Sequence, residues 1–274
     1  ALDDEIEYIR SLGVEIKTNS IGGQAVTIPQ LFEKGYHAVL ITTGIHWSKG
    51  FEFPGRDAKG VLTSQEFLFR MNFMFAYLHP KYMTTPHVGK KIVMIGSGFD
   101  AVDCGRLALR LGKKVTFVHP STEEDLEVSS EDKVYAQEEG LCFEMVTKPL
   151  EILKGGQGNV KELRCVRLDF ADKDGQWKLV PVEGSEFIID ADTVIISGQY
   201  TANNFISDLT PGLTINKQGS LCLRKDQSAT SLPGVFAAGG AAKGPIPLVD
   251  ALADAKKAAN EIDLYLQEDE KGKS

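Results

Sequence analysis

A pair of glycines is the clearest chemical signal in this sequence of 274 residues. The apolar run 92–95 leads without a gap into Gly96-x-Gly98-x-x-Ala101, and a helical pattern follows. A buried strand that turns at glycine into a helix can hold the pyrophosphate of a dinucleotide, because the first glycine permits the tight turn and the second lets the phosphates reach bare backbone. The helix N-terminus adds free N–H groups and a partial positive charge. The predicted phosphate-side residues are Gly96, Gly98, Phe99, Asp100 and Ala101.

The surroundings of this turn favour a dinucleotide site over a glycine turn without a ligand. The helical pattern 101–111 ends at Gly112, and the apolar run 114–118 follows at once as a second strand. The residue that contacts the adenosine ribose is expected about 20 residues after the first glycine, at the end of that second strand. His119 and Ser121 occupy this position, so they are the predicted ribose contacts.

Composition excludes several other classes of function. A net charge of −8 argues against nucleic acid and anionic membranes as default partners. No apolar run approaches the roughly 20 residues of a membrane-spanning helix, and residues 1–12 are acidic and amphipathic, unlike a signal peptide. The four cysteines lie far apart and the five histidines show no ligand spacing. This pattern predicts no metal site, free thiols and a cytoplasmic location. The cysteines are Cys104, Cys142, Cys165 and Cys222.

Hydrophobic periodicity predicts an α/β protein in which buried strands alternate with helices. Three of the buried strands end in glycine, at Gly44, Gly198 and Gly239. The predicted helices are 2–12, 28–32, 101–111 and 247–266. The predicted strands are 14–17, 36–43, 92–95, 114–118, 192–197, 221–223 and 235–238, with a meander over 160–170, 177–182 and 186–189.

The segment 67–83 is rich in phenylalanine, tyrosine and methionine. We interpret it as a helix and loop folded onto the core; the alternative is a hydrophobic surface for another subunit. The segment 86–89 begins with proline and ends with glycine, and it is interpreted as a hinge into the glycine-turn domain.

In their order, the segments resemble those of the two-dinucleotide flavoprotein oxidoreductases, and among these the small subunit of glutamate synthase and its relatives. The resemblance covers nearly all of residues 2–266. The segments that carry it are EIEYIRSLGVEIKTN, AVLITTG, FPGRDAKGV, IGSGFDAVDCGRLALRLGKKVTFV, DTVIISGQ, LPGVFAAGG and GPIPLVDALADAKKAANEIDLYL.

This resemblance implies a Rossmann-like NAD(P)-binding domain, with a small β-meander, inserted into an FAD-binding domain. The FAD domain would comprise 1–85 and 199–266, the NAD(P) domain 86–198, and 267–274 would be a charged tail. Gly198 and Gln199 would lie near the nicotinamide, and the helix from Pro247 would direct its N-terminus at the flavin. The implied flavin-side residues are Thr43, Gly44, Gly239, Gly240, Pro247, Leu248 and Val249.

The chain departs from the family at both cofactors. The family's opening strand and G-x-G-x-x-G turn, which hold the FAD pyrophosphate, would precede residue 1. Another chain would then supply the missing half of the FAD domain, or the sequence is a fragment, or the sheet is rebuilt. Gly240 stands where relatives place an aspartate that contacts the flavin's ribityl chain. Losing that hydrogen bond is expected to cost about 1.5–3 kcal/mol, or about tenfold to a hundredfold in affinity.

The nucleotide preference is also expected to differ. Relatives that use NADPH carry arginines just after the second strand, where they pair with the 2′-phosphate. Here the acidic run 123–127 follows His119 and Ser121, so NAD(H) is favoured over NADP(H).

The resemblance implies an NAD(P)H-dependent flavin oxidoreductase, incomplete alone, that transfers electrons between NAD(H) and FAD and feeds an iron–sulfur protein or a larger catalytic subunit. We assign no catalytic acid or base, since hydride transfer between stacked rings depends on positioning. Two alternatives stay open: a non-catalytic scaffold, and an NAD(H) sensor without flavin.

Overall fold

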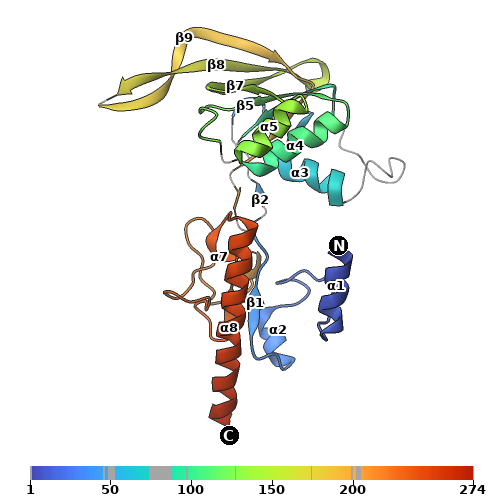
Figure 1. Cartoon of the computed structure of the whole chain (residues 1–274), viewed down its shortest axis with the longest axis vertical. Helices are drawn as coiled ribbons and strands as arrows, with labels where there is room; N and C mark the ends of the chain where they lie inside the picture. Colours follow the sequence, from blue (N-terminus) through green and yellow to red (C-terminus); the bar gives the residue numbers. More distant parts are fainter. Residues whose placement is uncertain are drawn as a thin grey trace. The chain divides into compact units, whose positions relative to one another are not determined.

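The computed structural model describes residues 2–45, 47–48, 53–73, 88–96, 98–126, 128–173, 175–198, 200–201 and 205–273. The chain divides into two compact units (Figure 1). Unit 1 comprises Ala1–His46 with Thr201–Ser274, and unit 2 comprises Trp47–Tyr200. Unit 2 therefore includes residues before 86. Which cofactor each segment serves remains a prediction.

A five-stranded parallel sheet forms the centre of unit 2, in the order β3-β10-β4-β5-β6. The predicted strands 92–95, 114–118 and 192–197 all lie in it. Parallel strands need crossover connections, which place layers on both faces of the sheet and explain the continuous apolar runs. The strands are β3 (Val61–Thr63), β4 (Lys91–Ile95), β5 (Lys114–Val118), β6 (Cys142–Glu144) and β10 (Thr193–Ile196).

Three helices cover one face of this sheet: α3 (Ser64–Leu68), α4 (Phe99–Arg110) and α5 (Ser130–Glu138) (Figure 1). Alternate residues of β4 point to opposite faces. Met94 packs with Ala101 of α4, whereas Ile95 packs with residues of the other layer. Burial on both faces is what holds the glycine turn at a fixed place on the sheet.

The other face carries the predicted meander, an antiparallel sheet in the order β7-β8-β9. Its strands are β7 (Thr147–Lys154), β8 (Val160–Lys173) and β9 (Gln176–Asp190), and a 3-10 turn, η2 (Gly156–Gly158), joins the first two. Strand β7 was not predicted from the sequence. Two strands were predicted where β9 forms one strand that continues through Gly184, with a register shift between Val166 and Leu168 of its partner β8.

The aromatic segment packs on the core as far as the structure describes it. Phe67 of α3 and Met71 are fully buried in the cluster that also contains α4 residues. Met71 lies in a π-helical turn, η1 (Phe69–Phe73). Phe67 and Met71 therefore agree with the core interpretation, whereas Phe69 is 51% exposed. Residues 74–83 and residues 86 and 87 of the predicted hinge lie outside the described residues.

Unit 1 contains a two-stranded parallel sheet of β1 (Val39–Ile41) and β12 (Val235–Ala237). Among the described residues β1 pairs with β12 alone, so its other edge is open. The helices of this unit are α1 (Leu2–Ser11), α2 (Ile28–Glu33), α6 (Phe205–Asp208), α7 (Gly240–Lys243) and α8 (Leu248–Lys273). A separate two-stranded sheet pairs β2 (Trp47–Ser48) with β11 (Tyr200–Thr201), at the sequence boundaries between the two units.

Several predicted elements of unit 1 differ from the structure. The predicted strand 14–17 is wrong: these residues form no ladder, and Val14 and Ile16 are exposed. The segment 221–223 makes only isolated bridges, and the strand predicted at 36–43 is three residues long. In contrast, α2 begins as expected, with Thr27 and Gln30 forming a capping box. Helix α8 continues through the predicted charged tail.

Within the described residues, no helix combines the length and the apolar character needed to cross a membrane.

Candidate functional site

Glycine is favoured at each of the two positions of the turn for a different structural reason. Gly96 has φ +140°, and a β-carbon there would lie 2.3 Å from the carbonyl oxygen of Ser197 on the neighbouring strand end. Gly98 has φ +92°, and a β-carbon there would meet only Asp100 Oδ1 within 4 Å among the described residues, at 3.7 Å. Gly96 is thus required by close packing. Gly98 leaves room for a ligand beside its backbone.

Helix α4 begins without a side-chain cap. Gly98 is its N-cap residue and makes no capping hydrogen bond. The N-caps of α2, α3 and α5, in contrast, accept a backbone N–H on their hydroxyl oxygens: Thr27, Thr63 and Ser129. The first-turn N–H groups of α4 therefore have no side-chain acceptor at the N-cap and can bind an anion such as a pyrophosphate.

Asp100 in the first turn of α4 connects the helix to two strand ends. Its Oδ2 accepts hydrogen bonds from the hydroxyls of Ser64 (2.7 Å) and Ser197 (3.0 Å). These bonds fix the start of the helix against β3 and β10. Phe99 is 59% exposed, whereas Ala101 is fully buried and lets α4 approach β4 closely.

His119 and Gly96 meet at the carboxyl ends of β5 and β4. His119 Nδ1 lies 2.8 Å from the carbonyl oxygen of Gly96, and the ring is buried. A cavity of about 260 Å³ adjoins this contact. Its lining residues are Phe53, Ile95, Gly96, His119, Pro120, Lys148 and Pro149. The fold thus brings together Gly96 and His119, which two separate features of the sequence predicted as site residues.

Lys148 is a charged lining residue that sequence reasoning missed. It lies in β7, whose first residue Thr147 donates its backbone N–H to the carbonyl oxygen of His119 (2.9 Å). The predicted ribose contact Ser121 lies in the loop that follows β5 and His119, and its carbonyl oxygen accepts the N–H of Val146 (3.0 Å). The eight residues of β7, with Pro149 near the start, show no clear alternation of apolar and polar residues. The strand was therefore not predicted, and the position of Lys148 beside the cavity could not be inferred.

The third strand end adjoins the turn on its other side. Ser197, at the end of β10, is buried, and its N–H donates to the carbonyl oxygen of Ile95 (2.7 Å). Gly198 follows it, and the predicted contact Gln199 lies outside the described residues. Parallel strand ends that meet at a glycine turn are the usual location of ligands in α/β folds.

In unit 1, the parallel register of β1 and β12 brings the predicted flavin-side glycines together. The N–H of Ala238 donates to the carbonyl oxygen of Ile41 (3.1 Å). A β-carbon on Gly240 would lie 3.2 Å from the backbone nitrogen of Ile45 and 3.3 Å from the Cα of Gly44. Gly240 therefore allows a close approach of two backbone segments that a side chain would disturb.

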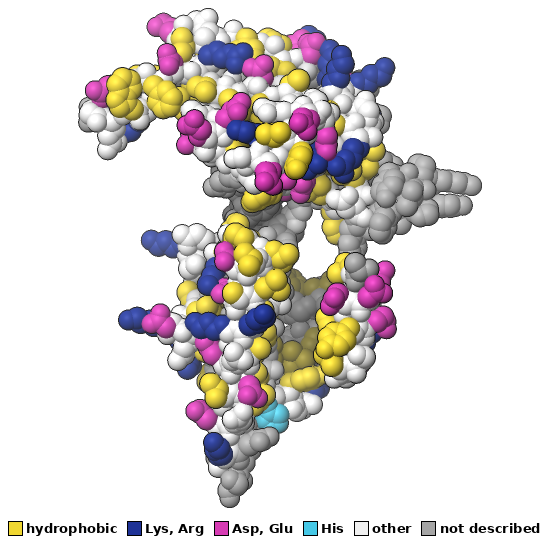
Figure 2. Space-filling model, in the orientation of Figure 1, with side chains coloured by type: hydrophobic (Ala, Val, Ile, Leu, Met, Phe, Trp, Pro, Cys, Tyr) yellow, Lys and Arg dark blue, Asp and Glu magenta, His cyan; other side chains and the backbone are white. Residues whose placement is uncertain are grey.

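The residues of unit 1 that are predicted to bind a flavin are only partly suited to it. Helix α8 begins next to Pro247 and exposes Leu248 (77%) and Val249 (70%), where Figure 2 shows hydrophobic side chains gathered at the surface. The partial positive charge of a helix N-terminus suits a ring that becomes anionic on reduction, and the apolar side chains suit the faces of that ring. The recess lined by Thr43 and Gly44, however, measures only about 20 Å³, about the room of one water molecule.

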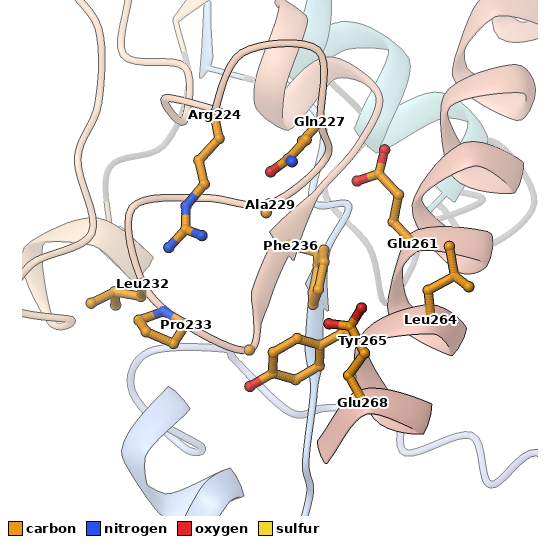
Figure 3. Close-up of a pocket in the computed structure, with 11 residues that line it drawn as sticks. Arg224, Gln227, Ala229, Leu232, Pro233, Phe236, Glu261, Leu264, Tyr265 and Glu268 are labelled. Atoms are coloured by element: carbon orange, nitrogen blue, oxygen red, sulfur yellow. The ribbon is translucent and has the colours of Figure 1, made fainter. Parts of the chain in front are cut away.

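A second cavity of unit 1, of about 500 Å³, lies at the amino end of β12 (Figure 3). Phe236 and Tyr265 meet there edge to face, with ring centroids 5.6 Å apart. Glu261 of α8 accepts the backbone N–H of Ser228 (2.6 Å) and so holds the 224–234 loop on the helix. None of the sequence-predicted site residues lines this cavity, and its contacts serve the packing of α8.

The cysteines are free, and two of them are inert by position. Cys104 and Cys165 are fully buried, and burial raises the pKa of both thiols, that of Cys165 to about 12. Cys142 is exposed. The described residues contain no cluster of histidine, cysteine and carboxylate side chains suited to a metal ion.

A parallel sheet with a strand–glycine turn–helix unit on one face and a meander on the other defines a dinucleotide-binding α/β protein. The family model for pyridine nucleotide-disulphide oxidoreductases matches residues 6–259, and the chain belongs to that family. The resemblance inferred from the sequence is thereby confirmed.

Similar curated proteins come from several bacteria. The chain is 32% identical over 273 residues to the NADP(+)-dependent formate dehydrogenase subunit beta of Moorella thermoacetica, covering 97% of this chain and 37% of that protein. It is 31% identical to the NADPH-Fe(3+) oxidoreductase subunit beta of Geobacter sulfurreducens, covering 97% and 42%. It is 30% identical to the glutamate synthase [NADPH] small chain of Escherichia coli, covering 95% and 57%. The chain thus spans about two fifths to three fifths of their lengths.

Solved structures confirm the fold class. FprA from Mycobacterium tuberculosis in complex with NADPH superposes with a TM-score of 0.68 at 19% identity, over 93% of this chain and 69% of that one. Thioredoxin reductase from T. acidophilum gives 0.60 at 22% identity, over 84% and 66%. At these identities the similarity concerns the fold alone.

Proposed function

We propose that this chain is an oxidoreductase module that binds a pyridine nucleotide on unit 2 and exchanges electrons with a flavin bound through unit 1. One observation carries the proposal: α4 begins, without a side-chain cap, at a glycine turn beside a cavity lined by Gly96 and His119. Such a turn binds phosphates through backbone N–H groups, and membership of the family supports a nucleotide as the ligand.

The nucleotide would be held at the strand ends of unit 2. The first-turn N–H groups of α4 would bind the pyrophosphate, and the end of β5 would contact the adenosine ribose. Asp100 would act by holding the helix start in place through Ser64 and Ser197. The proposed nucleotide residues are Gly96, Gly98, Phe99, Asp100, Ala101, His119, Ser121, Gly198 and Gln199.

A bound FAD would supply the redox chemistry, since its ring accepts a hydride and can release electrons one at a time. The chain's own part would be to bind and orient it: the N-terminus of α8 would stabilise negative charge on the ring, and the exposed Leu248 and Val249 would cover apolar ring surface. The proposed flavin residues are Thr43, Gly44, Gly239, Gly240, Pro247, Leu248 and Val249.

A further polypeptide segment would complete unit 1. Among the described residues, the open edge of β1 presents unpaired backbone groups, and α1 buries none of its residues although Leu2 and Ile9 are apolar. An added strand, from this polypeptide or another chain, would pair with the open edge of β1. The relatives are named as subunits or small chains of larger enzymes, which supports an electron-accepting partner, for which we propose an iron–sulfur protein. Free thiols support a cytoplasmic location.

The nucleotide preference inferred from the sequence, NAD(H) over NADP(H), receives no support from the relatives, whose names specify NADPH or NADP(+). We therefore propose that the chain binds either nucleotide at the same turn.

Two measurements test the function. Calorimetric titration with NADH and NADPH is expected to give micromolar binding to the 274-residue chain. Anaerobic addition of the same nucleotides to protein loaded with FAD is expected to bleach the flavin's visible absorbance. Nucleotide binding without any flavin uptake would indicate the sensor alternative, which the small recess at Thr43 and Gly44 favours. Failure of both nucleotides to bind at millimolar concentration would indicate a scaffold.

A further inference from the structure

The cavity at Gly96 and His119 has one charged side chain at its rim whose role is not explained by packing. The cavity lies beyond the carboxyl ends of β4 and β5, which is where the adenosine half of a dinucleotide sits when its pyrophosphate occupies the turn after β4. Its walls are mostly apolar, from Phe53, Ile95 and the prolines, which suits an adenine ring. Lys148 supplies a cation at the same place.

The backbone fixes Lys148 close to the ribose position. Its neighbour Thr147 donates its N–H to the carbonyl oxygen of His119 (2.9 Å), and Lys148 itself pairs with Val166 in the ladder between β7 and β8. The side chain is exposed, so the ammonium group can move over the mouth of the cavity. Unlike a lysine in a flexible loop, Lys148 therefore has a backbone position that is fixed by hydrogen bonds of the strand and its neighbours.

Neighbouring charges leave this cation available. Lys148 makes no ion pair within the described part of the chain. Two nearby carboxylates are engaged elsewhere: Glu123 pairs with Lys133 (3.0 Å), and Glu144 at the end of β6 pairs with Arg167 (2.7 Å). Asp125 accepts hydrogen bonds from Thr122. The ion pair of Glu123 thus offsets one of the negative charges of the acidic run.

We propose that Lys148 is a specificity-determining residue of the nucleotide site, which favours NADP(H) by pairing with the 2′-phosphate of the adenosine ribose. The inference rests on the proposed function, because it requires a dinucleotide at the turn of Gly96 and Gly98. Lysine is a compact cation that binds phosphate as a point charge, and a cation beside the ribose is the general means of accepting a 2′-phosphate. A lysine from the meander would here replace arginines placed just after the second strand.

The test compares nucleotides that differ only in the 2′-phosphate. Calorimetry measures the binding of NADPH, NADH, 2′,5′-ADP and 5′-AMP to the 274-residue chain and to Lys148→Ala. The variant is expected to lose about tenfold in affinity for NADPH and for 2′,5′-ADP, a value at the lower end for a charge-assisted bond because the lysine is exposed. Affinity for NADH and 5′-AMP is expected to be unchanged, because neither carries the phosphate.

Two further variants serve as controls. Lys148→Arg keeps the charge and is expected to retain most of the preference for NADPH. Lys114→Ala removes an exposed lysine from the opposite, amino end of β5 and is expected to change nothing. In the unsubstituted chain, raising the salt concentration is expected to reduce the preference for NADPH, since the pair is exposed to solvent.

The outcomes separate the two proposals. If Lys148→Ala weakens NADPH and NADH equally, or neither, then Lys148 does not recognise the phosphate and this inference is wrong, while the nucleotide site stands. If neither nucleotide binds the unsubstituted chain, the proposed function fails, and the inference fails with it. A loss confined to NADPH and 2′,5′-ADP, rescued by Lys148→Arg, supports both.

Discussion

The backbone of Gly96 lies directly against the carbonyl oxygen of Ser197, so that a β-carbon on Gly96 would be 2.3 Å from that oxygen. The contact joins the ends of β4 and β10, where the N–H of Ser197 also donates to Ile95 (2.7 Å). The first glycine of the motif is therefore fixed by strand packing, independently of any ligand. A ligand that binds at this turn meets a backbone that is already in place.

Gly96→Ala is expected to destabilise unit 2 and to abolish nucleotide binding. The side chain would clash with Ser197, and φ +140° is a strained conformation for alanine, which together cost more than about 2 kcal/mol. Gly156→Ala is the control, since a β-carbon there meets nothing within 4 Å and the backbone angle is ordinary. Thermal unfolding and calorimetry measure both effects. A Gly96→Ala protein with an unchanged Tm would show that the strand ends can separate without cost.

The Arg106–Glu139 pair predicts a pH dependence of stability. Arg106 of α4 donates two hydrogen bonds to Glu139 just beyond α5 (3.0 and 2.6 Å), and these lower the pKa of Glu139 from 4.5 to about 2. Because the folded state lowers this pKa, the carboxylate stabilises the fold above pH 4.5, and the contribution is lost as the pH falls toward 2.

Glu139→Gln is expected to reduce stability at neutral pH and to make little difference near pH 2. Urea unfolding across this pH range measures the difference from the unsubstituted protein. Glu138→Gln is the matched control, since Glu138 is adjacent and exposed and makes no ion pair in the described part of the chain. A gap between the two proteins that stayed constant with pH would contradict the assignment.

Thiol reactivity is expected to follow burial. Cys142 is exposed and should react rapidly with an alkylating reagent at neutral pH, whereas Cys104 and Cys165 should react only on unfolding, because burial raises their pKa and excludes the reagent. Mass spectrometry of the native protein after a short exposure identifies the modified cysteine. Cys142→Ser should remove the rapid phase; rapid labelling of Cys104 would indicate that α4 separates from the sheet.

The start of α8 is expected to influence a bound flavin. In protein loaded with FAD, Leu248→Glu should weaken binding and lower the flavin's reduction potential, because a carboxylate at the helix N-terminus opposes negative charge on the reduced ring. Leu264→Glu introduces the same charge at an exposed position four turns further along the helix, and it should have little effect on either quantity. Equal effects of both variants would argue against a flavin at this helix end.

The strands of unit 2 were easier to predict from the sequence than those of unit 1, for a physical reason. In unit 2 the strands are buried on both faces, so their apolar runs at 92–95, 114–118 and 192–197 were evident without a structure. The meander strand β7 is half-buried and carries a proline, and the missing alternation hid it. In unit 1 the strands are short and half-paired, and the apolar residues at Val14 and Ile16, which suggested a strand, are exposed without a partner.

The sequence by itself determined the strand, the glycine turn and the helix that follows, because these depend on neighbours along the chain: the apolar run, the spacing of Gly96, Gly98 and Ala101, and the stop at Gly112. It also selected His119 by its distance from the first glycine. Only the tertiary structure decided that Gly96 packs against Ser197 and that Lys148 reaches the same cavity as His119. These residues lie 101 and 29 positions from their partners, and only the pairing of strands brings such distant residues together.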